Sequence, residues 1–253
     1  MADIDLNSDL GEGFGPWAMG DDAAMLAVVS SANVACGGHA GDAETMFATL
    51  TLAKAQGVVV GAHPGYTDPA GFGRRVIPMS LPQIERMVAA QIGSLMGVAA
   101  LTGAHVAYVK AHGALANLAA DDLDVATALM RAVRAVSPDL ACLAISGTCQ
   151  EQAALNAGLP TYSEVFADRA YLPNGRLVPR SHKAAMIHDP AQATTRLLGF
   201  LETGLMPVLQ GDPIALRGQS ICVHGDSPGA VAMAQHIRAA LQGAGVSVRA
   251  FLR

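Results

Sequence analysis

Histidine and acidic side chains follow several short apolar runs of this chain, at the point where each run ends. The first run, at residues 4–6, leads into two carboxylates, and later runs lead into histidines. Four of the eight histidines lie there, each within two residues of a glycine, which lets the backbone turn sharply beside a ligand. One such histidine is usually a loop residue, but the repetition predicts a shared site. The recurring residues are Asp9, Glu12, His39, His63, His112 and His224.

The carboxylates and imidazoles of this set support two kinds of chemistry. Histidine nitrogen and carboxylate oxygen are the usual ligands of Zn²⁺ or Mn²⁺. The same groups also form metal-free acid/base sites, in which a carboxylate orients an imidazole. The sequence contains no H-x-x-x-H pair or other compact ligand motif, so spacing leaves both alternatives open. We assign no metal ligand and predict a catalytic set of Asp9, Glu12, His39, His63 and His112.

Basic side chains near the same run ends are suited to binding anionic groups. Lys110 follows the fourth run, where it can bind a carboxylate or phosphoryl oxygen or pair with Asp9 or Glu12. Arg74 and Arg75 lie in a glycine-rich loop, either as a solvated charge pair or as an anion clamp. We expect Asp168 to position Arg169. The predicted substrate-binding set is Asn7, Arg75, Lys110, Asp168, Arg169, His224 and Asp226.

The elements that position these residues alternate between short apolar runs and stretches of helical periodicity. This pattern is typical of parallel strands covered by helices. About seven such units in 253 residues fit an α/β fold of the (β/α) barrel type, regular or distorted, with an open doubly wound sheet as the alternative. In a barrel the carboxyl ends of all strands open on one face, so the polar residues would converge.

The expected elements can be given by residue range. Strands are expected at 4–6, 32–36, 58–61, 106–109, 141–145, 162–166 and 221–223, with 246–251 as a further candidate. Helices are expected at about 22–30, 43–56, 81–101, 122–136, 148–157, 191–203 and 228–243. The long irregular stretch 166–190 is a candidate active-site loop.

The composition favours one globular domain, which we place at residues 1–253. Hydrophobic residues make up 51% and charged residues 15%, which is ample material for a core. The net charge of −5 argues against a nucleic-acid or anionic-membrane binder. Residues 87–109 carry no charge, but their polar residues and glycines favour a helix and a buried strand over a membrane span. Without a secretory signal or a disulfide pattern, we expect a cytoplasmic protein.

Six stretches of the chain resemble the LamB/YcsF (lactam-utilisation) family, whose members form the A subunit of 5-oxoprolinase. The stretches follow family order across nearly the whole chain, and each is long. They are DLNSDLGEGFG (5–15), SANVACGGHAGD (31–42), GAHPGYTDPAGFGRR (61–75), VKAHGALAN (109–117), EVFADRAYLPNGRLVPRS (164–181) and ICVHGDSPGAV (221–231).

The resemblance implies a distorted TIM-like barrel of the glycoside hydrolase/deacetylase type. It implies ATP-dependent hydrolysis of 5-oxo-L-proline to L-glutamate by a complex with subunits B and C. The sequence has no P-loop. ATP would therefore bind to this chain, to the partner subunits, or at an interface between them. Gly38, Ala111 and Ala116 replace a Phe, a Pro and a Tyr of the family pattern, which implies a reshaped pocket.

Two other functions stay open at this point. One is an ATP-independent, metal-dependent amide or sugar deacetylase, which would hold a divalent metal. The other is a non-catalytic subunit that binds the lactam while the chemistry takes place elsewhere. The sequence leaves the oligomeric state open, including a homo-oligomer.

Overall fold

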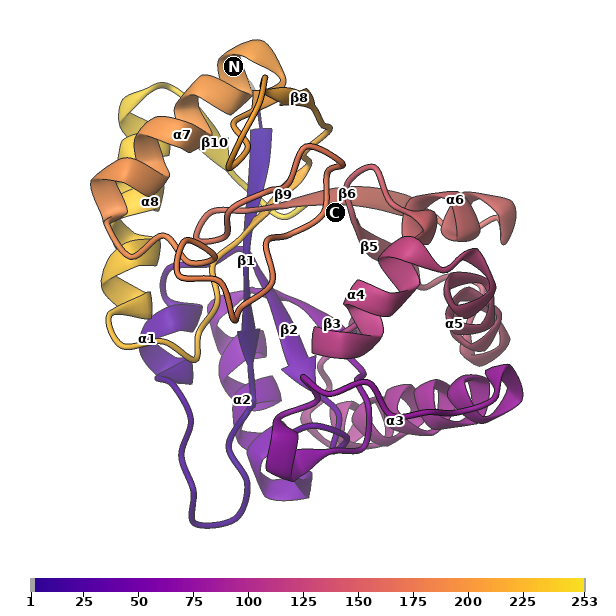
Figure 1. The fold of residues 1–253 in the computed structure, drawn as a ribbon. Helices are drawn as coiled ribbons and strands as arrows, with labels where there is room; N and C mark the ends of the chain where they lie inside the picture. Colours follow the sequence, from indigo (N-terminus) through magenta and orange to yellow (C-terminus); the bar gives the residue numbers. More distant parts are fainter. Residues whose placement is uncertain (1–2, 253) are drawn as a thin grey trace.

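Seven parallel strands close into a barrel in the computed structural model, which describes residues 3–252 (Figure 1). Neighbouring strands follow chain order from β1 to β6, and β9 closes the ring by pairing with both β6 and β1. The predicted TIM-like barrel is therefore confirmed, and the open sheet was the wrong alternative. The strands are β1 (Asp3–Leu10), β2 (Ser31–Ala35), β3 (Val59–His63), β4 (Val106–Val109), β5 (Ala141–Ile145), β6 (Thr161–Phe166) and β9 (Ser220–Cys222).

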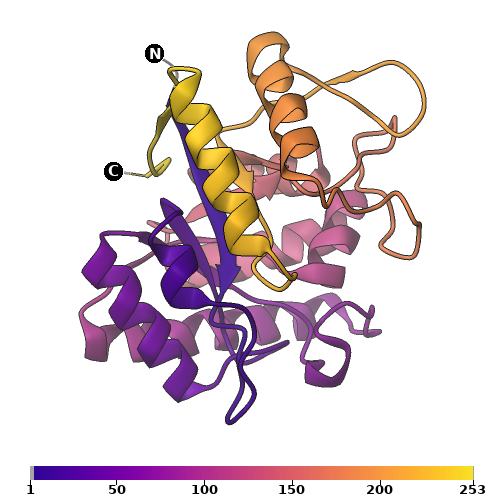
Figure 2. The ribbon, with the colours of Figure 1, turned by 90° about the vertical axis from the view of Figure 1, so that its left-hand side faces the viewer.

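Helices surround this barrel, and Figure 2 shows two of them, α7 and α8, side by side. Aspartates cap several helices: the side chain of Asp42 accepts a hydrogen bond at the start of α2, and that of Asp189 does so at the start of α7. The helices are α1 (Asp22–Leu26), α2 (Ala43–Gln56), α3 (Leu81–Thr102), α4 (Gly113–Asp121), α5 (Leu123–Val136), α6 (Cys149–Asn156), α7 (Pro190–Thr203) and α8 (Ala230–Gly243), with a 3₁₀ turn at Pro69–Gly71.

The structure departs from the expected elements in five places. Helix α1 is shorter than the range 22–30, and α4 was not predicted. Helix α8 begins at Ala230 rather than 228, because Gly229 adopts the left-handed conformation at its N-cap. The expected last strand shrinks to β10 (Ser247–Val248), parallel to β1. The short antiparallel pair β7 (Leu205–Met206) and β8 (Ile214–Ala215) was also missed.

The interior of the barrel is polar, while the main apolar core lies between the strands and the helices. Strand β1 shows how this arises, since its side chains alternate between the two sides. Ile4 and Leu6 join the apolar core. Asp5 accepts hydrogen bonds from three serines, and the Asn7 side chain donates to Glu164 Oε1 at 2.9 Å. This buried hydrogen-bonded column leads up the barrel axis to Asp9.

Helix α3 is long and apolar enough to cross a membrane, judged by length and composition alone. It nevertheless packs against α2 and α5 of the barrel, and Val88, Ile92 and Leu95 on its inner face are fully buried. Strand β4 follows it directly. The prediction of a helix and a buried strand over residues 87–109 is thus confirmed.

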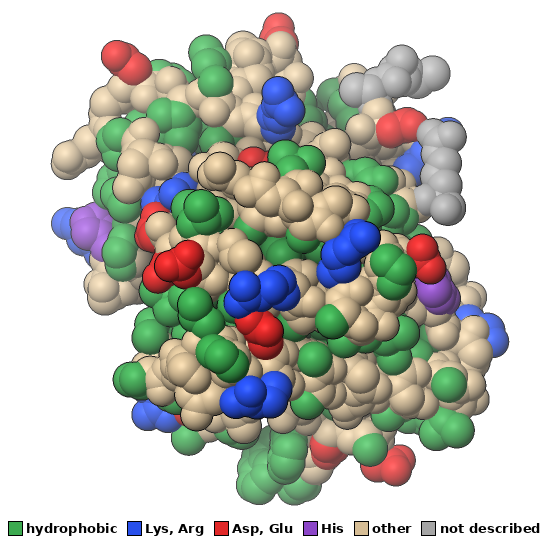
Figure 3. Space-filling view, turned by 90° about the vertical axis from the view of Figure 1, so that its right-hand side faces the viewer, with side chains coloured by type: hydrophobic (Ala, Val, Ile, Leu, Met, Phe, Trp, Pro, Cys, Tyr) green, Lys and Arg blue, Asp and Glu red, His purple; other side chains and the backbone are tan. Residues whose placement is uncertain are grey.

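The face drawn in Figure 3 mixes basic and acidic side chains, and hydrophobic ones are dispersed among them. A group of hydrophobic side chains projects at the lower edge of this view. In the chain, the loop between β1 and α1 carries the exposed Phe14, Trp17 and Met19. The described side chains on this face form no continuous basic surface.

Candidate active site

A cavity of about 550 Å³ opens at the carboxyl ends of the barrel strands. Its walls include the first turn of α4 and part of the irregular segment that follows β6. The candidate active-site loop therefore does contribute to the cavity, through residues 172–180. Of the predicted site residues, those lining the cavity are Asp9, Lys110, His63, His112, Arg169 and His224.

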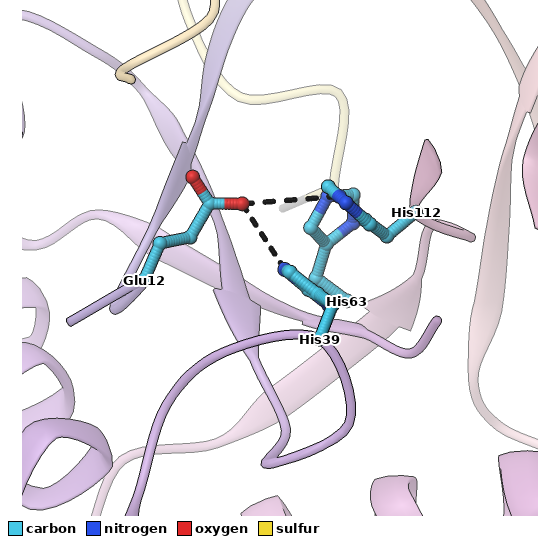
Figure 4. Close-up of side chains that lie close together, drawn as sticks. All are labelled: Glu12, His39, His63 and His112. Carbon is cyan, nitrogen blue, oxygen red and sulfur yellow. Dashed lines mark hydrogen bonds and ion pairs between the residues drawn. The ribbon is translucent and has the colours of Figure 1, made fainter. Parts of the chain in front are cut away.

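Three histidines and Glu12 form a tight cluster at one side of this cavity (Figure 4). The rings of His39 and His112 stack in parallel with centroids 3.5 Å apart, and His63 meets both edge-on. Glu12 Oε1 lies 3.1 Å from His39 Nε2 and 3.8 Å from His112 Nδ1. The convergence predicted for these four residues is present, although they come from different segments of the chain.

Backbone carbonyl groups determine which ring nitrogen of two histidines carries the proton. His63 Nδ1 lies 2.8 Å from the carbonyl oxygen of Lys110, and His112 Nε2 lies 2.8 Å from that of Phe72. A carbonyl oxygen only accepts, so each of these nitrogens must donate. The other nitrogens, His63 Nε2 and His112 Nδ1, face each other at 3.1 Å.

Glycines allow the backbone to approach this cluster closely. Gly73 has a φ of +61°, and a Cβ there would lie 2.7 Å from His39 Cβ and 2.9 Å from His112 Cδ2. The Gly73 carbonyl also accepts the amide of Ala114 in the first turn of α4. Glycine is therefore required both by conformation and by space.

Burial and neighbouring charges shift the protonation of the cluster. Burial lowers the pKa values of His39 and His112 well below their usual range, and the neighbouring histidines of the cluster add to the effect. Burial also raises the pKa of Glu12 well above its usual value, as do the negative charges of Asp9 and Asp226. The cluster thus holds neutral imidazoles beside a carboxyl group that resists ionisation.

Lys110 lies at the centre of a second buried group on the barrel axis. Its Nζ is 2.9 Å from Asp9 Oδ1, 2.9 Å from Glu164 Oε1 and 3.2 Å from Cys222 Sγ. Burial by itself would lower the pKa of Lys110, but these neighbours raise it well above its usual value. Burial likewise opposes ionisation of Asp9, yet the neighbouring His63 and the ammonium group of Lys110 hold its pKa well below the usual range.

Arg169 and His224 also line the cavity, and Asp168 and Asp226 contact residues that line it. Asp168 accepts a hydrogen bond from His224 Nδ1 at 2.9 Å. Arg169 donates to the carbonyl oxygens of Val178 and Ala185. Burial lowers the pKa of Arg169 to about 10, and the positive charge of Arg180 contributes. Asp226 forms an ion pair with Arg74.

Two predicted assignments need correction. Arg75 does not line the cavity; its side chain is 63% exposed and pairs with Asp68, which turns it away from the strand ends. Arg74, whose side chain is 33% exposed, lines the cavity in its place. Asp168 is hydrogen-bonded to His224 rather than to Arg169, because two backbone carbonyls hold the guanidinium.

Several residues of the site were not in the predicted sets. Glu164 lies near the end of β6 and had the same signal as the others, a polar residue at a strand end, but it was not selected. Asn33 lies inside β2, where its Nδ2 donates to Asp9 Oδ1 at 2.9 Å. Arg180 lines the cavity from the irregular segment, and no pattern in the sequence marks it.

Comparison with known proteins identifies the family. The family model described as LamB/YcsF matches residues 4–253. A protein from Rhodopseudomonas palustris (strain BisA53), named as the A subunit of 5-oxoprolinase, is 49% identical over 254 residues, covering 100% of both chains. One of the same name from Azorhizobium caulinodans is 47% identical over 251 residues, covering 99% of both.

A solved structure agrees in fold over the same length. The crystal structure of the lactam utilization protein from Thermus thermophilus superposes with a TM-score of 0.93 at 42% sequence identity. The match covers 98% of this chain and 100% of that one. The chain therefore belongs to the LamB/YcsF family.

Proposed function

We propose that this chain is the A subunit of an ATP-dependent 5-oxoprolinase, which hydrolyses 5-oxo-L-proline to L-glutamate in the cytoplasm together with subunits B and C. The relatives that carry the name of this subunit support the proposal, since they match the full length of the chain at 47–49% identity. The resemblance of the six sequence stretches supports the same substrate.

The observation that carries the proposal is the arrangement of two kinds of groups around one cavity. Proton-transferring groups, the carboxyls and imidazoles, and guanidinium groups line this cavity together. Opening a lactam requires a base for the attacking water and an acid for the ring nitrogen. It also requires cations for the substrate carboxylate and any phosphoryl oxygens. The cavity holds both sets of groups.

Asp9 and His63 are the residues best suited to move protons. The pKa of Asp9 lies well below its usual value, so its carboxylate stays ionised, and its Oδ1 lies 3.4 Å from His63 Nε2. Both the Asp9 carboxylate and the unprotonated His63 Nε2 can accept a proton, so either can activate water beside the lactam carbonyl. Arg74, Arg169 and Arg180 line the cavity and would bind the anionic groups. Glu12, His39 and His112 hold the imidazole in place.

Coupling to ATP has a physical reason. A lactam resists hydrolysis because its amide is resonance-stabilised, and phosphorylation of the amide oxygen makes the ring carbon electrophilic. The sequence has no P-loop. We therefore place ATP either on subunits B and C or at an interface that they share with this chain.

The test measures glutamate and ADP released from 5-oxoproline and ATP by the reconstituted subunits, with and without this chain. One-to-one release that requires this chain is the expected result. Asp9→Asn in the same complex should then abolish most of the turnover. Full turnover by subunits B and C alone would contradict the proposal, and full turnover with Asp9→Asn would leave this chain a lactam-binding subunit.

An ATP-independent, metal-dependent amide hydrolase is the second candidate, and one observation favours it. The unprotonated nitrogens of His63 and His112 face each other and are suited to holding a cation. This candidate predicts that the isolated chain, loaded with metal, releases product without ATP. Omission of ATP from the same assay separates the two candidates.

A further inference from the structure

His63 Nε2 and His112 Nδ1 face each other without a hydrogen between them to form a hydrogen bond. Their protons are committed elsewhere, since His63 Nδ1 and His112 Nε2 each donate to a backbone carbonyl at 2.8 Å. Two neutral imidazoles oriented in this way direct two lone pairs at each other across 3.1 Å. Such a contact is repulsive unless a positive charge, either a metal ion or an added proton, lies against both nitrogens.

The geometry matches that of two ligands of one metal ion. Nitrogens at about 2.0–2.1 Å from a Zn²⁺ are about 2.9 Å apart at a right angle and about 3.4 Å apart at the tetrahedral angle. The observed 3.1 Å lies between these values. Histidines that bind metals almost always donate their second N–H to a carbonyl or carboxylate, as His63 and His112 do here.

A third ligand atom lies on the same side. Glu12 Oε1 is 3.8 Å from His112 Nδ1, and the ligand atoms of Glu12, His39, His63 and His112 all lie within 4.8 Å of one another. His39 Nε2 lies 3.1 Å from Glu12 Oε1, where it can donate to the carboxylate and orient it. His39 Nδ1 is buried and has no hydrogen-bond partner among the described residues.

The neighbouring group around Lys110 contains a positively charged side chain, whereas the cluster of Glu12 and the three histidines does not. Asp9, Cys222 and His224 also lie within ligand distance of one another. There, however, the ammonium group of Lys110 contacts both Asp9 Oδ1 and Cys222 Sγ and supplies the positive charge. A metal ion would have to displace it. Beside Glu12 and the three histidines, the described residues place no lysine or arginine in hydrogen-bonding contact.

The geometry points to a divalent metal site of the zinc class in this chain, formed by His63 Nε2, His112 Nδ1 and Glu12 Oε1, with His39 orienting Glu12. Such an ion accepts nitrogen and oxygen ligands together. A site with three protein ligands keeps a position for water or for a substrate oxygen. The inference does not rest on the proposed function, because metal binding is measured without any turnover.

The test begins with the full chain stripped by a chelator, dialysed and incubated with Zn²⁺ or Co²⁺. After desalting, elemental analysis should find one equivalent of metal, and bound Co²⁺ should show the visible absorption of a nitrogen-ligated ion. His63→Ala and His112→Ala should each weaken binding by more than about 100-fold. His39→Ala should weaken it by about 10–100-fold, as expected for an orienting partner.

Two variants serve as matched controls. His224→Ala removes a histidine from the same cavity, and His105→Ala removes an exposed one. Both should retain one equivalent of metal. Loss of metal in His224→Ala with retention in His63→Ala would overturn the proposal, because the ion would then belong to the group around Asp9.

Nitrogen-15 NMR of the wild-type histidines keeps the proposal testable where a variant fails to fold. In the metal-free chain it should show His63 protonated on Nδ1 and His112 on Nε2, and Zn²⁺ should shift the two unprotonated nitrogens. Retention of less than about 0.1 equivalent of either metal would overturn the proposal, and a proton shared between the two rings would then supply the positive charge instead.

Discussion

Two groups of buried acids lie next to each other at the mouth of the barrel, and they differ in whether the chain supplies a cation. Asp9 and Glu164 share the ammonium group of Lys110. Glu12 instead faces three imidazoles, two of which burial keeps neutral. The pKa values of the two acids therefore shift in opposite directions. That of Asp9 falls well below its usual value, and that of Glu12 rises well above it.

This difference separates two tasks within one cavity. Asp9, which pairs with the permanent cation of Lys110, is held ionised and in place, whatever else is bound. A carboxyl group among neutral imidazoles responds to what enters the site, whether a proton, a metal ion or a substrate. Burial is similar for Asp9 and Glu12, so the neighbouring charge decides between these two, whereas at Glu164 burial prevails and raises the pKa.

The largest expected effect is on turnover in the reconstituted complex. We expect His63→Ala and Asp9→Asn each to lower kcat by about 10²–10⁴, the range for loss of an acid/base group. Both residues join the two groups, because Asp9 Oδ1 contacts Lys110 and also lies 3.4 Å from His63 Nε2. His105→Ala, which changes an exposed residue that does not line the cavity, is the matched control. A loss of less than about twofold in both variants would show that the groups do not cooperate in catalysis.

The next effect is on stability and tests the role of the Lys110 ammonium group. Lys110→Met leaves Asp9 and Glu164 buried without a neighbouring cation, so the free energy of unfolding should fall by about 3–5 kcal/mol. Urea denaturation measures this loss. Glu164→Gln in the same chain removes one of the uncompensated charges and should restore part of the stability. Equal stability of the single and double variants would mean that loss of the ion pairs does not cause the lower free energy of unfolding.

A pH experiment extends the comparison to a third acid, Asp5, which has serines rather than a cation beside it. Burial raises the pKa of Asp5 to about 6. Because the folded state holds this proton more tightly than the unfolded state, stability should fall as pH rises from about 4 to about 6. Asp5→Asn removes this cost, so its advantage over wild type should grow by up to about 3 kcal/mol between pH 4 and pH 7.

Urea denaturation of the two proteins at both pH values measures this difference. Asp9→Asn provides the contrasting case, because a lowered pKa in the folded state contributes stability that is lost as pH falls. Its disadvantage relative to wild type should therefore be nearly the same at pH 7 and pH 4, and should shrink only as the pH falls below about 4, the usual pKa of an aspartate. A constant difference for Asp5→Asn would show that this carboxyl titrates normally.

The smallest effect distinguishes two adjacent arginines. Arg74→Ala should raise KM for the anionic substrate by about tenfold, which corresponds to about 1.4 kcal/mol. Arg75→Ala should leave KM and kcat within about twofold, because its exposed guanidinium pairs with Asp68 outside the cavity. Steady-state kinetics of the complex measure both. The reverse result would restore Arg75 as the anion clamp.

The strands of this fold were predictable because each one is a short apolar run bounded by polar residues. The number of units favoured a barrel over an open sheet, and the pairing of β9 with both β6 and β1 shows the closure. The site was predictable only as far as strand ends converge, which located Asp9, His63, Lys110 and His112. Helix α4, a short alanine-rich element that begins directly after His112, was not predicted.

The remaining details depend on tertiary contacts that no local pattern encodes. Arg74 rather than Arg75 lines the cavity because Asp68, at the start of the turn Pro69–Gly71, pairs with Arg75. The pairing of Asp168 with His224 joins residues 56 positions apart in the chain. Which histidine nitrogen carries a proton is decided by the backbone carbonyls of Lys110 and Phe72, so sequence spacing could not choose between the metal and acid/base alternatives.

The pairing of β1 with β9 also determines how late in synthesis the barrel can close. Asp5 lies beside Ser220, 215 residues later, and β9 is the strand that closes the ring. The first strand to leave the ribosome therefore keeps an unpaired edge until nearly the whole chain has been made, and such edges favour aggregation. A chain that stops before β9 should accordingly be bound by chaperones or degraded by proteases, and it should have no partial activity.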